Sequence, residues 1–195
     1  MYLLTANAGL ALSWAYLAWS CSKVWVEPLD LLNLDQLHQQ TMFCIILSFL
    51  EPLNAALGYT RSKVSSTMLF VIGRSFIALY ISQQFPDNTH SIQYLVTITC
   101  WALGELVRFS SFFVISVSKD LQTPALSIRY NVGPLMFTAG FLGEFVMLAV
   151  ACLSSWSLVS PFLYLITIAW PFAWYSLFAS LMRQRTKFYS ALSNK

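Results

Sequence analysis

The chain has 195 residues, of which 57% are hydrophobic and only 10% are charged. Because a soluble domain carries about 25% charged residues, this composition excludes an ordinary soluble protein and indicates a polytopic membrane protein. The formal net charge of +3 is too small, and too concentrated at one end, to indicate nucleic acid as a partner. We expect an all-α fold in which one transmembrane bundle accounts for residues 1–195.

The apolar runs predict six transmembrane helices, since about 20 residues are needed to cross a bilayer as a helix. The expected spans cover residues 2–19, 41–59, 65–82, 91–116, 129–153 and 162–182. Residues 21–40 carry four charges and are expected to form a loop with an amphipathic turn or two: Lys23, Glu27, Asp30 and Asp35. Residues 83–90, which include Pro86-Asp87-Asn88, are the clearest loop signal in the chain.

The basic residues outside these spans gather on one side of the expected membrane. With six crossings, one side holds Lys23 alone, and the other holds Arg61, Lys63, Lys119, Arg183, Arg185, Lys187 and Lys195. Lys and Arg are retained on the side that is not translocated. Both termini are therefore expected on the cytoplasmic or matrix side.

The cysteines, the histidines and most tryptophans are interpreted as structural residues. The four cysteines form no CxxC pair, and neither His38 nor His90 has a second histidine at a metal-ligand spacing. We therefore expect no metal and no cofactor. Five tryptophans lie near expected helix ends and are interpreted as anchors at the membrane interface: Trp14, Trp19, Trp25, Trp156 and Trp170.

Ionisable residues inside the expected spans are the main functional signal. They are Glu51, Arg74, Glu105, Arg108 and Glu144, with Arg129 at the entrance of the fifth span. A charge in hydrocarbon costs about 2.5 to 3.5 kcal/mol on insertion scales, so it needs a partner or a function. Glu105 and Arg108 are three residues apart and are expected to pair on one helix face. Arg74 has no such neighbour, so its partner is expected from another span, with Glu51 or Glu144 as candidates.

Two interpretations of these charges stay open at the level of the sequence. The charges either form ion pairs that hold the bundle together or line a polar cavity for a partly anionic ligand. Phe137 and Glu144 are seven residues apart, which places them on one helix face about 10.5 Å apart along the axis. Gly133 and Gly140 flank that face and allow either close helix packing or a gap for a substrate chain. A channel would need a continuous wet pore, which the pairing of Glu105 with Arg108 disfavours.

At these residues the sequence resembles the 3-hydroxyacyl-CoA dehydratases of very-long-chain fatty acid elongation, also called protein-tyrosine-phosphatase-like membrane proteins. The family pattern Leu-Glu-x-Leu-His-Ala-x-x-Gly is similar to residues 50–58, Leu-Glu-Pro-Leu-Asn-Ala-Ala-Leu-Gly. The family's Glu-Ile-Ile-Arg-Tyr resembles Glu-Leu-Val-Arg-Phe at 105–109. Its Arg-Tyr and Leu-Tyr-Pro-x-Gly-x-x-x-Glu block resembles Arg129-Tyr130 and residues 136–144. The resemblance covers nearly the whole chain and implies the same six-span bundle.

The resemblance implies that a tyrosine and a glutamate on the fifth span eliminate water from a 3-hydroxyacyl thioester. Such a hydro-lyase needs a base for the proton beside the carbonyl and a donor for the departing hydroxide. The glutamate is present as Glu144, but Phe137 occupies the tyrosine position and has no proton to donate. Phe70 replaces a family glutamine, and Asn54 replaces a family histidine.

These departures give a leading hypothesis of a dehydratase-like membrane protein that no longer catalyses. It would bind membrane lipids or acyl chains, or serve as a subunit of a larger complex, with elongase components or an energy-transducing complex as partners. The alternative is an active very-long-chain dehydratase that uses another proton donor. Tyr130 would lie about 21 Å from Glu144 along an unbroken helix, and four tyrosines on other spans stay open: Tyr59, Tyr80, Tyr94 and Tyr164. The resemblance implies the endoplasmic reticulum, with the mitochondrial inner membrane as the alternative.

Overall fold

The computed structural model describes residues 2–26, 31–60, 62–154 and 160–193, and in these residues the chain is all-α, as predicted. Long helices alternate with short helical segments along the chain. In chain order they are α1 (Tyr2–Val26), α2 (Leu31–Ser48), α3 (Leu50–Ala56), α4 (Val64–Ser75), the π-helix η1 (Phe76–Ile81), α5 (Ser82–Gln84), α6 (Pro86–Thr89), α7 (Ile92–Val117), α8 (Gln122–Ser154) and α9 (Ser160–Ser193).

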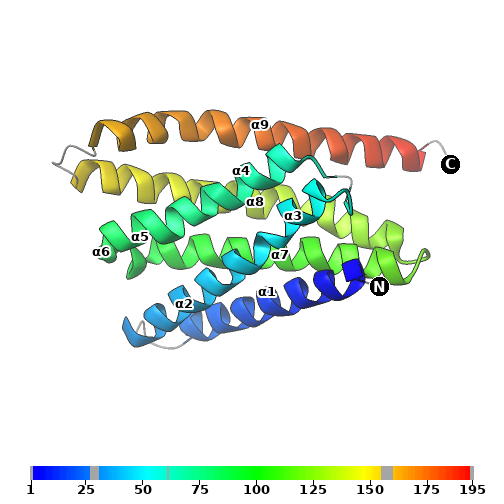
Figure 1. Ribbon diagram of the computed structural model, residues 1–195, viewed down its shortest axis with the longest axis horizontal. Coiled ribbons are helices and arrows are strands. Elements are labelled where there is room, and N and C mark those ends of the chain that lie inside the picture. The colour runs from blue at the N-terminus through cyan, green and yellow to red at the C-terminus, as the bar shows by residue number, and fades with distance from the viewer. Residues whose placement is uncertain (1, 27–30, 61, 155–159, 194–195) are drawn as a thin grey trace.

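The helices form one elongated bundle (Figure 1). Helices α1, α7, α8 and α9 lie side by side in that order, each packed against the next. The α2–α3 segment and the α4–η1–α5 segment cross one face of this row, where α2 packs on α1, α3 on α4, and η1 on α8. The two ends of the chain lie at the same end of the bundle (Figure 1).

Among the residues that the structure describes, four helical segments are long and apolar enough to cross a membrane. They are Val64–Gln84, Ile92–Val117, Gln122–Ser154 and Pro161–Ser193. Helices of this length and composition identify an integral membrane protein. Helix α1 and the α2–α3 pair fall outside this group, so the count of six crossings stays a prediction.

The loop expected over residues 21–40 is wrong, because helix continues on both sides of residues 27–30. Helix α1 runs on to Val26, and α2 begins at Leu31. Cys21, Val24 and Leu37 are buried, whereas Lys23 and Asp35 are exposed. The charges therefore occupy the outer face of amphipathic helices, in which apolar side chains still recur at helical spacing. Glu27 and Asp30 lie outside the described residues.

The single helix expected over residues 41–59 is interrupted at Phe49, between α2 and α3. Pro52 explains the break, because proline has no N–H and its ring clashes with the carbonyl four residues earlier, here that of Ser48. The chain then turns at Gly58, whose φ of 75° is a conformation that suits glycine. The break places Glu51 at the start of the short helix α3.

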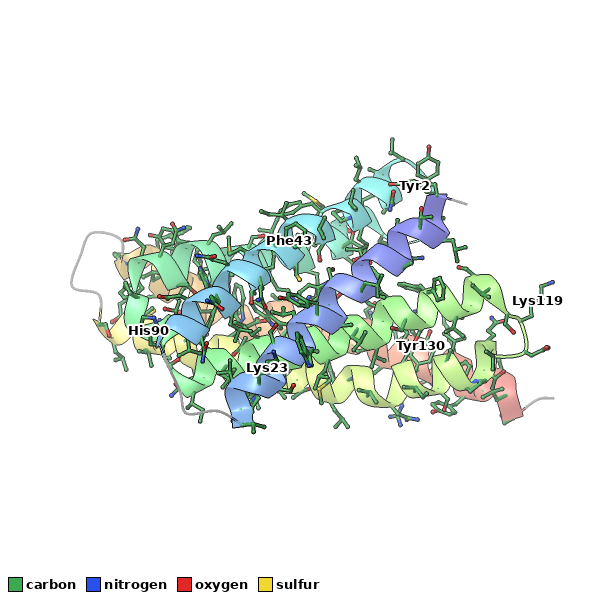
Figure 2. All side chains as sticks on the ribbon, turned by 90° about the horizontal axis from the view of Figure 1, so that it is seen from below. Tyr2, Lys23, Phe43, His90, Lys119 and Tyr130 are labelled. Carbon is green, nitrogen blue, oxygen red and sulfur yellow. The ribbon has the colours of Figure 1, made fainter. Side chains whose placement is uncertain are left out.

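The core lies between the helices, and charged residues lie toward both ends of the bundle. Figure 2 shows Tyr2 and Lys119 at one end, and Lys23 and His90 toward the other. The largest fully buried side chains include Trp14, Leu17, Tyr94, Ile98 and Met147. Trp14 is therefore a core residue and its interpretation as an interfacial anchor is wrong, whereas Trp19 and Trp25 are about half exposed. Trp156 lies outside the described residues.

Gly143 marks the closest approach of α8 to α7, and Gly143→Ala is expected to lower the free energy of unfolding by about 1–3 kcal/mol. A Cβ there would collide with Thr97 Oγ1 and lie 3.4 Å from the backbone carbonyl oxygen of Gln93. Thr97 Oγ1 cannot turn away freely, because it donates a 2.7 Å hydrogen bond to that carbonyl. Thermal unfolding in detergent measures the effect.

Gly133→Ala is the matched control on the same helix, because nothing lies within 4 Å of a Cβ at Gly133. It should leave the unfolding temperature unchanged or raise it slightly, since alanine favours helix over glycine. Equal destabilisation by the two substitutions would show that α7 and α8 do not pack closely at Gly143.

Candidate functional site

A cavity of about 800 Å³ lies between α3 and α4 on one side and α7, α8 and α9 on the other. Its size is typical of a site for one small ligand. All six ionisable residues that the sequence singled out contribute to its wall: Glu51, Arg74, Glu105, Arg108, Arg129 and Glu144. The fold thus brings charges from four separate helices to one place.

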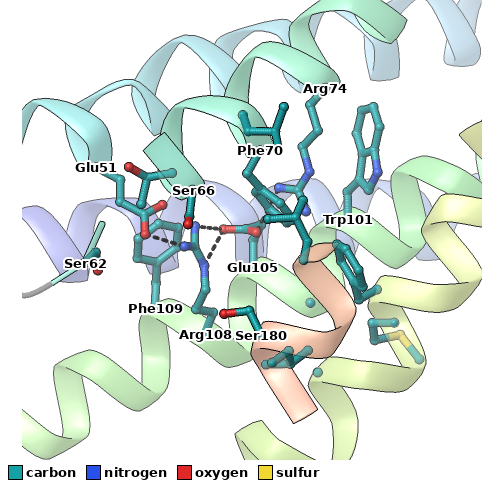
Figure 3. A pocket seen from close by; sticks show the side chains of 18 of the residues that line it. Glu51, Ser62, Ser66, Phe70, Arg74, Trp101, Glu105, Arg108, Phe109 and Ser180 are labelled. Carbon is teal, nitrogen blue, oxygen red and sulfur yellow. Dashed lines mark hydrogen bonds and ion pairs between the residues drawn. The ribbon is translucent and has the colours of Figure 1, made fainter. Parts of the chain in front are cut away.

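Four of these residues form a continuous chain of ion pairs, shown in Figure 3. Arg74 Nη1 lies 2.8 Å from Glu105 Oε1. Glu105 Oε2 accepts hydrogen bonds from Nε of Arg108, at 3.0 Å, and from its Nη2. Arg108 Nη1 in turn donates to Glu51 Oε1. Two cations and two carboxylates therefore neutralise each other, which makes their burial tolerable.

This chain confirms the pairing of Glu105 with Arg108 and corrects the partner expected for Arg74. The partner does come from another helix, but it is Glu105, not Glu51 or Glu144. One carboxylate has two oxygens, so Glu105 holds Arg74 with one and Arg108 with the other. Glu51 is occupied by Arg108.

Glu144 is held by two tryptophans. Trp101 Nε1, on α7, donates to Glu144 Oε1 at 2.8 Å, and Trp170 Nε1, on α9, donates to Oε2 at 3.0 Å. Both oxygens thus accept a hydrogen bond from an indole, and no cation of the described chain lies within ion-pair distance. Sequence reasoning overlooked Trp101 and interpreted Trp170 as an anchor. The sequence signal that could have found these two residues is that an indole N–H inside a membrane protein needs a hydrogen-bond acceptor.

Phe70 and Phe137 meet in the middle of the cavity. Their rings stack with centroids 5.8 Å apart and planes inclined by 18°. The Arg74 guanidinium lies 4.1 Å from the centre of the Phe70 ring, and Figure 3 shows the two side chains together. The resemblance implies a glutamine at position 70 and a tyrosine at position 137, and the structure has a contact between two apolar rings there. Asn54, the third departure, accepts a 2.9 Å hydrogen bond from the Tyr2 hydroxyl.

No tyrosine belongs to the wall of the cavity in the described part of the chain. Tyr94 is fully buried and bonds to His38 instead. Helix α8 passes Pro134 without a break, so Tyr130 keeps its distance along the helix from Glu144. Tyr59, Tyr80 and Tyr164 are likewise absent from the wall. None of the phenols considered as replacement donors reaches the cavity.

The two glycines that flank the Glu144 face have different structural roles. A Cβ on Gly140 would lie 3.3 Å from the Trp101 ring, so this glycine allows close packing of α8 on α7. Gly133 has no atom within 4 Å of that position and lines the cavity. Close packing and a gap for a ligand therefore both occur, one at each glycine.

The helices and this cavity define a polytopic α-helical membrane protein with a charge-lined pocket between its helices. Residues 45–191 match the family described as Protein tyrosine phosphatase-like protein, PTPLA, and the chain belongs to this family. It is dehydratase-like, because the curated relatives that it matches carry the name of very-long-chain (3R)-3-hydroxyacyl-CoA dehydratases.

Three relatives show the extent of the similarity. The rice dehydratase PASTICCINO 2B is 22% identical over 151 residues, which cover 77% of this chain and 68% of the rice protein. Human dehydratase 3 is 26% identical over 104 residues, 53% of this chain and 28% of the human protein. The zebrafish dehydratase is 25% identical over 105 residues, 53% of this chain and 29% of the relative. No solved structure matches this chain significantly.

Proposed function

We propose that this protein is a dehydratase-like membrane protein that does not catalyse, and that it binds acyl lipid as a subunit of a larger membrane complex. The observation that carries the proposal is the absence of a phenol from the described wall of a cavity that still contains Glu144. Elimination of water needs a proton donor as well as a base. Phe137, stacked on Phe70, offers a ring in place of that donor.

The state of Glu144 supports the same proposal. Each carboxylate oxygen already accepts an indole hydrogen bond. These two hydrogen bonds join α8 to α7 and α9, which gives Glu144 a structural role that needs no catalysis. The ion-pair chain pairs Arg74, Glu105, Arg108 and Glu51 with one another, so these four residues are assigned to holding the bundle together.

Incubation of the purified full-length protein with a 3-hydroxyacyl-CoA is expected to give no enoyl product above the rate without protein. A general acid typically contributes about 10² to 10⁴ in rate, so its loss should be visible beside an active relative assayed in parallel. Mass spectrometry of the thioesters measures turnover. Turnover that is abolished by Glu144→Gln would overturn the proposal.

An active dehydratase with a substitute donor is the second candidate, and Cys100 favours it. The Cys100 side chain lines the cavity and lies against Gly140, one helical turn before Glu144. A thiol can donate a proton where Phe137 cannot. This candidate requires turnover that falls on Cys100→Ala and rises on Phe137→Tyr; no response to either change would exclude it.

The membrane and the partners belong to the same proposal. The names of the relatives support fatty acid elongation and hence the endoplasmic reticulum, with the mitochondrial inner membrane as the alternative. Both termini lie at one end of the bundle, and most basic residues outside the expected spans belong to the same side. This distribution supports a cytoplasmic or matrix location for that side. Proteins that copurify in mild detergent distinguish elongase components from subunits of an energy-transducing complex.

A further inference from the structure

Two cations of the cavity wall form no ion pair with any described residue. The ion-pair chain pairs Arg74 with Glu105, and Arg108 with Glu105 and Glu51, which leaves the exposed Lys63 and the half-buried Arg129 as the other basic residues of the wall. No carboxylate of the described residues lies within ion-pair distance of Arg129, whose guanidinium instead sits 4.4 Å from the Phe112 ring centre. We call Lys63 and Arg129 the basic end of the cavity. An anion bound there would supply the missing charge.

A buried acceptor without a partner lies near the basic end. Glu51 is only 8% exposed, and its Oε2 accepts no hydrogen bond although Oε1 is held by Arg108. Glu51 is among the charged neighbours of Arg129. A buried carboxylate oxygen is costly to leave unsatisfied, so a donor such as a hydroxyl group is the expected complement. Figure 3 shows Glu51 facing the cavity beside Ser62 and Ser66.

An apolar corridor leads from the basic end toward Glu144. Met136, Phe137 and Phe141 of α8 and Trp174 and Leu177 of α9 line it, and Phe141 stacks on Trp174. Arg129 and Glu144 are fifteen residues apart, which is about 22 Å along the helix axis at 1.5 Å per residue. That length suits one long acyl chain, and a volume of about 800 Å³ holds one such chain with its head group.

We propose that the cavity binds a monoacyl phospholipid, with its phosphate between Lys63 and Arg129 and its chain in the apolar corridor. The free glycerol hydroxyl of such a lipid lies beside Glu51, where a small shift of the Glu51 side chain lets its buried Oε2 accept a hydrogen bond from the hydroxyl. Two uncompensated cations match a single phosphate group, and a single corridor matches a single chain. The inference rests on the lipid-binding part of the proposed function and names the class of lipid.

The test measures thermal unfolding of the full-length protein in detergent with three oleoyl probes. Oleoyl lysophosphatidate is expected to raise the unfolding temperature in a concentration-dependent manner, because a ligand of the folded state stabilises it. Monooleoylglycerol, which has the chain and hydroxyls without the phosphate, is expected to give no shift. Oleoyl-CoA tests whether a thioester with several phosphates is preferred.

Arg129→Gln is expected to weaken lysophosphatidate binding at least about tenfold, the loss expected for a charge-assisted hydrogen bond. Arg129→Lys keeps the charge and should retain part of the affinity. Lys119→Gln is the matched control, because Lys119 is an exposed cation at the same end of the bundle but outside the cavity wall.

Three results would overturn the inference: equal stabilisation by monooleoylglycerol, tighter binding of oleoyl-CoA, or unchanged affinity in Arg129→Gln. The comparison of lysophosphatidate with monooleoylglycerol uses the unaltered protein. It therefore shows whether binding requires the phosphate even if the Arg129 variants fail to fold. Turnover is read in a separate assay. Failure of this inference and failure of the non-catalytic proposal are therefore distinguishable.

Discussion

Glu105→Gln is expected to lower the free energy of unfolding by about 3–5 kcal/mol, the range observed when one partner of a buried ion pair is removed. Glu105 is 2% exposed and pairs with both Arg74 and Arg108. The amide keeps the shape of the side chain but leaves Arg74 without a carboxylate partner and Arg108 with Glu51 alone. Thermal unfolding in detergent, followed by circular dichroism, measures the loss.

Asp35→Asn provides the control for this prediction. Asp35 is 3.1 Å from His90, and its side chain is 60% exposed. Exposed pairs contribute about 0 to 1 kcal/mol, so the same chemical change there should have little effect on stability. If Glu105→Gln proved as mild as Asp35→Asn, the buried chain of ion pairs would not be what holds α3, α4 and α7 together.

Trp170→Phe is expected to lower the free energy of unfolding by about 1.5–3 kcal/mol, the contribution of a hydrogen bond to a charged group. The substitution keeps an aromatic ring but removes the indole N–H that bonds to Glu144 Oε2. One oxygen of a half-buried carboxylate is then left without a donor. Because this bond joins α9 to α8, protection of α9 against proteolysis or hydrogen exchange should fall as well.

Trp174→Phe makes the same chemical change one turn further along α9. Its Nε1 is buried without a hydrogen-bond partner, while its ring stacks on Phe141 and Phe178. Removing an unsatisfied donor carries no hydrogen-bond penalty, so the variant should lose less stability than Trp170→Phe. The reverse order would show that ring packing, and not the bond to Glu144, holds α9 in place.

The cavity divides into two parts with different physics. Around Glu105, charges neutralise one another through direct pairs, and these contacts join α3, α4 and α7. Around Glu144, neutral indole donors from α7 and α9 surround a single carboxylate. The Phe70 and Phe137 rings stack within the same cavity. A ligand that extends from Arg129 to Glu144 would therefore pass from a basic to an aromatic environment.

The amino-acid sequence alone was enough to predict the class of protein and to single out six ionisable residues that line the cavity. Hydropathy is a property of each segment's own side chains, so the long apolar helices and the membrane assignment could be predicted without any tertiary contact. The pair of Glu105 and Arg108 was also predictable, because residues three apart share a helix face. The loop predicted over residues 21–40 was wrong, because the charged face of an amphipathic helix has the same composition as a charged loop.

How these residues meet could be learned only from the folded protein. The partner of Arg74 lies 31 residues away in sequence, and the two tryptophans that hold Glu144 lie 43 and 26 residues away from it. The stacking of Phe70 on Phe137 likewise joins separate helices. Contacts of this kind depend on helix packing and rotation, which residue spacing within one helix does not encode.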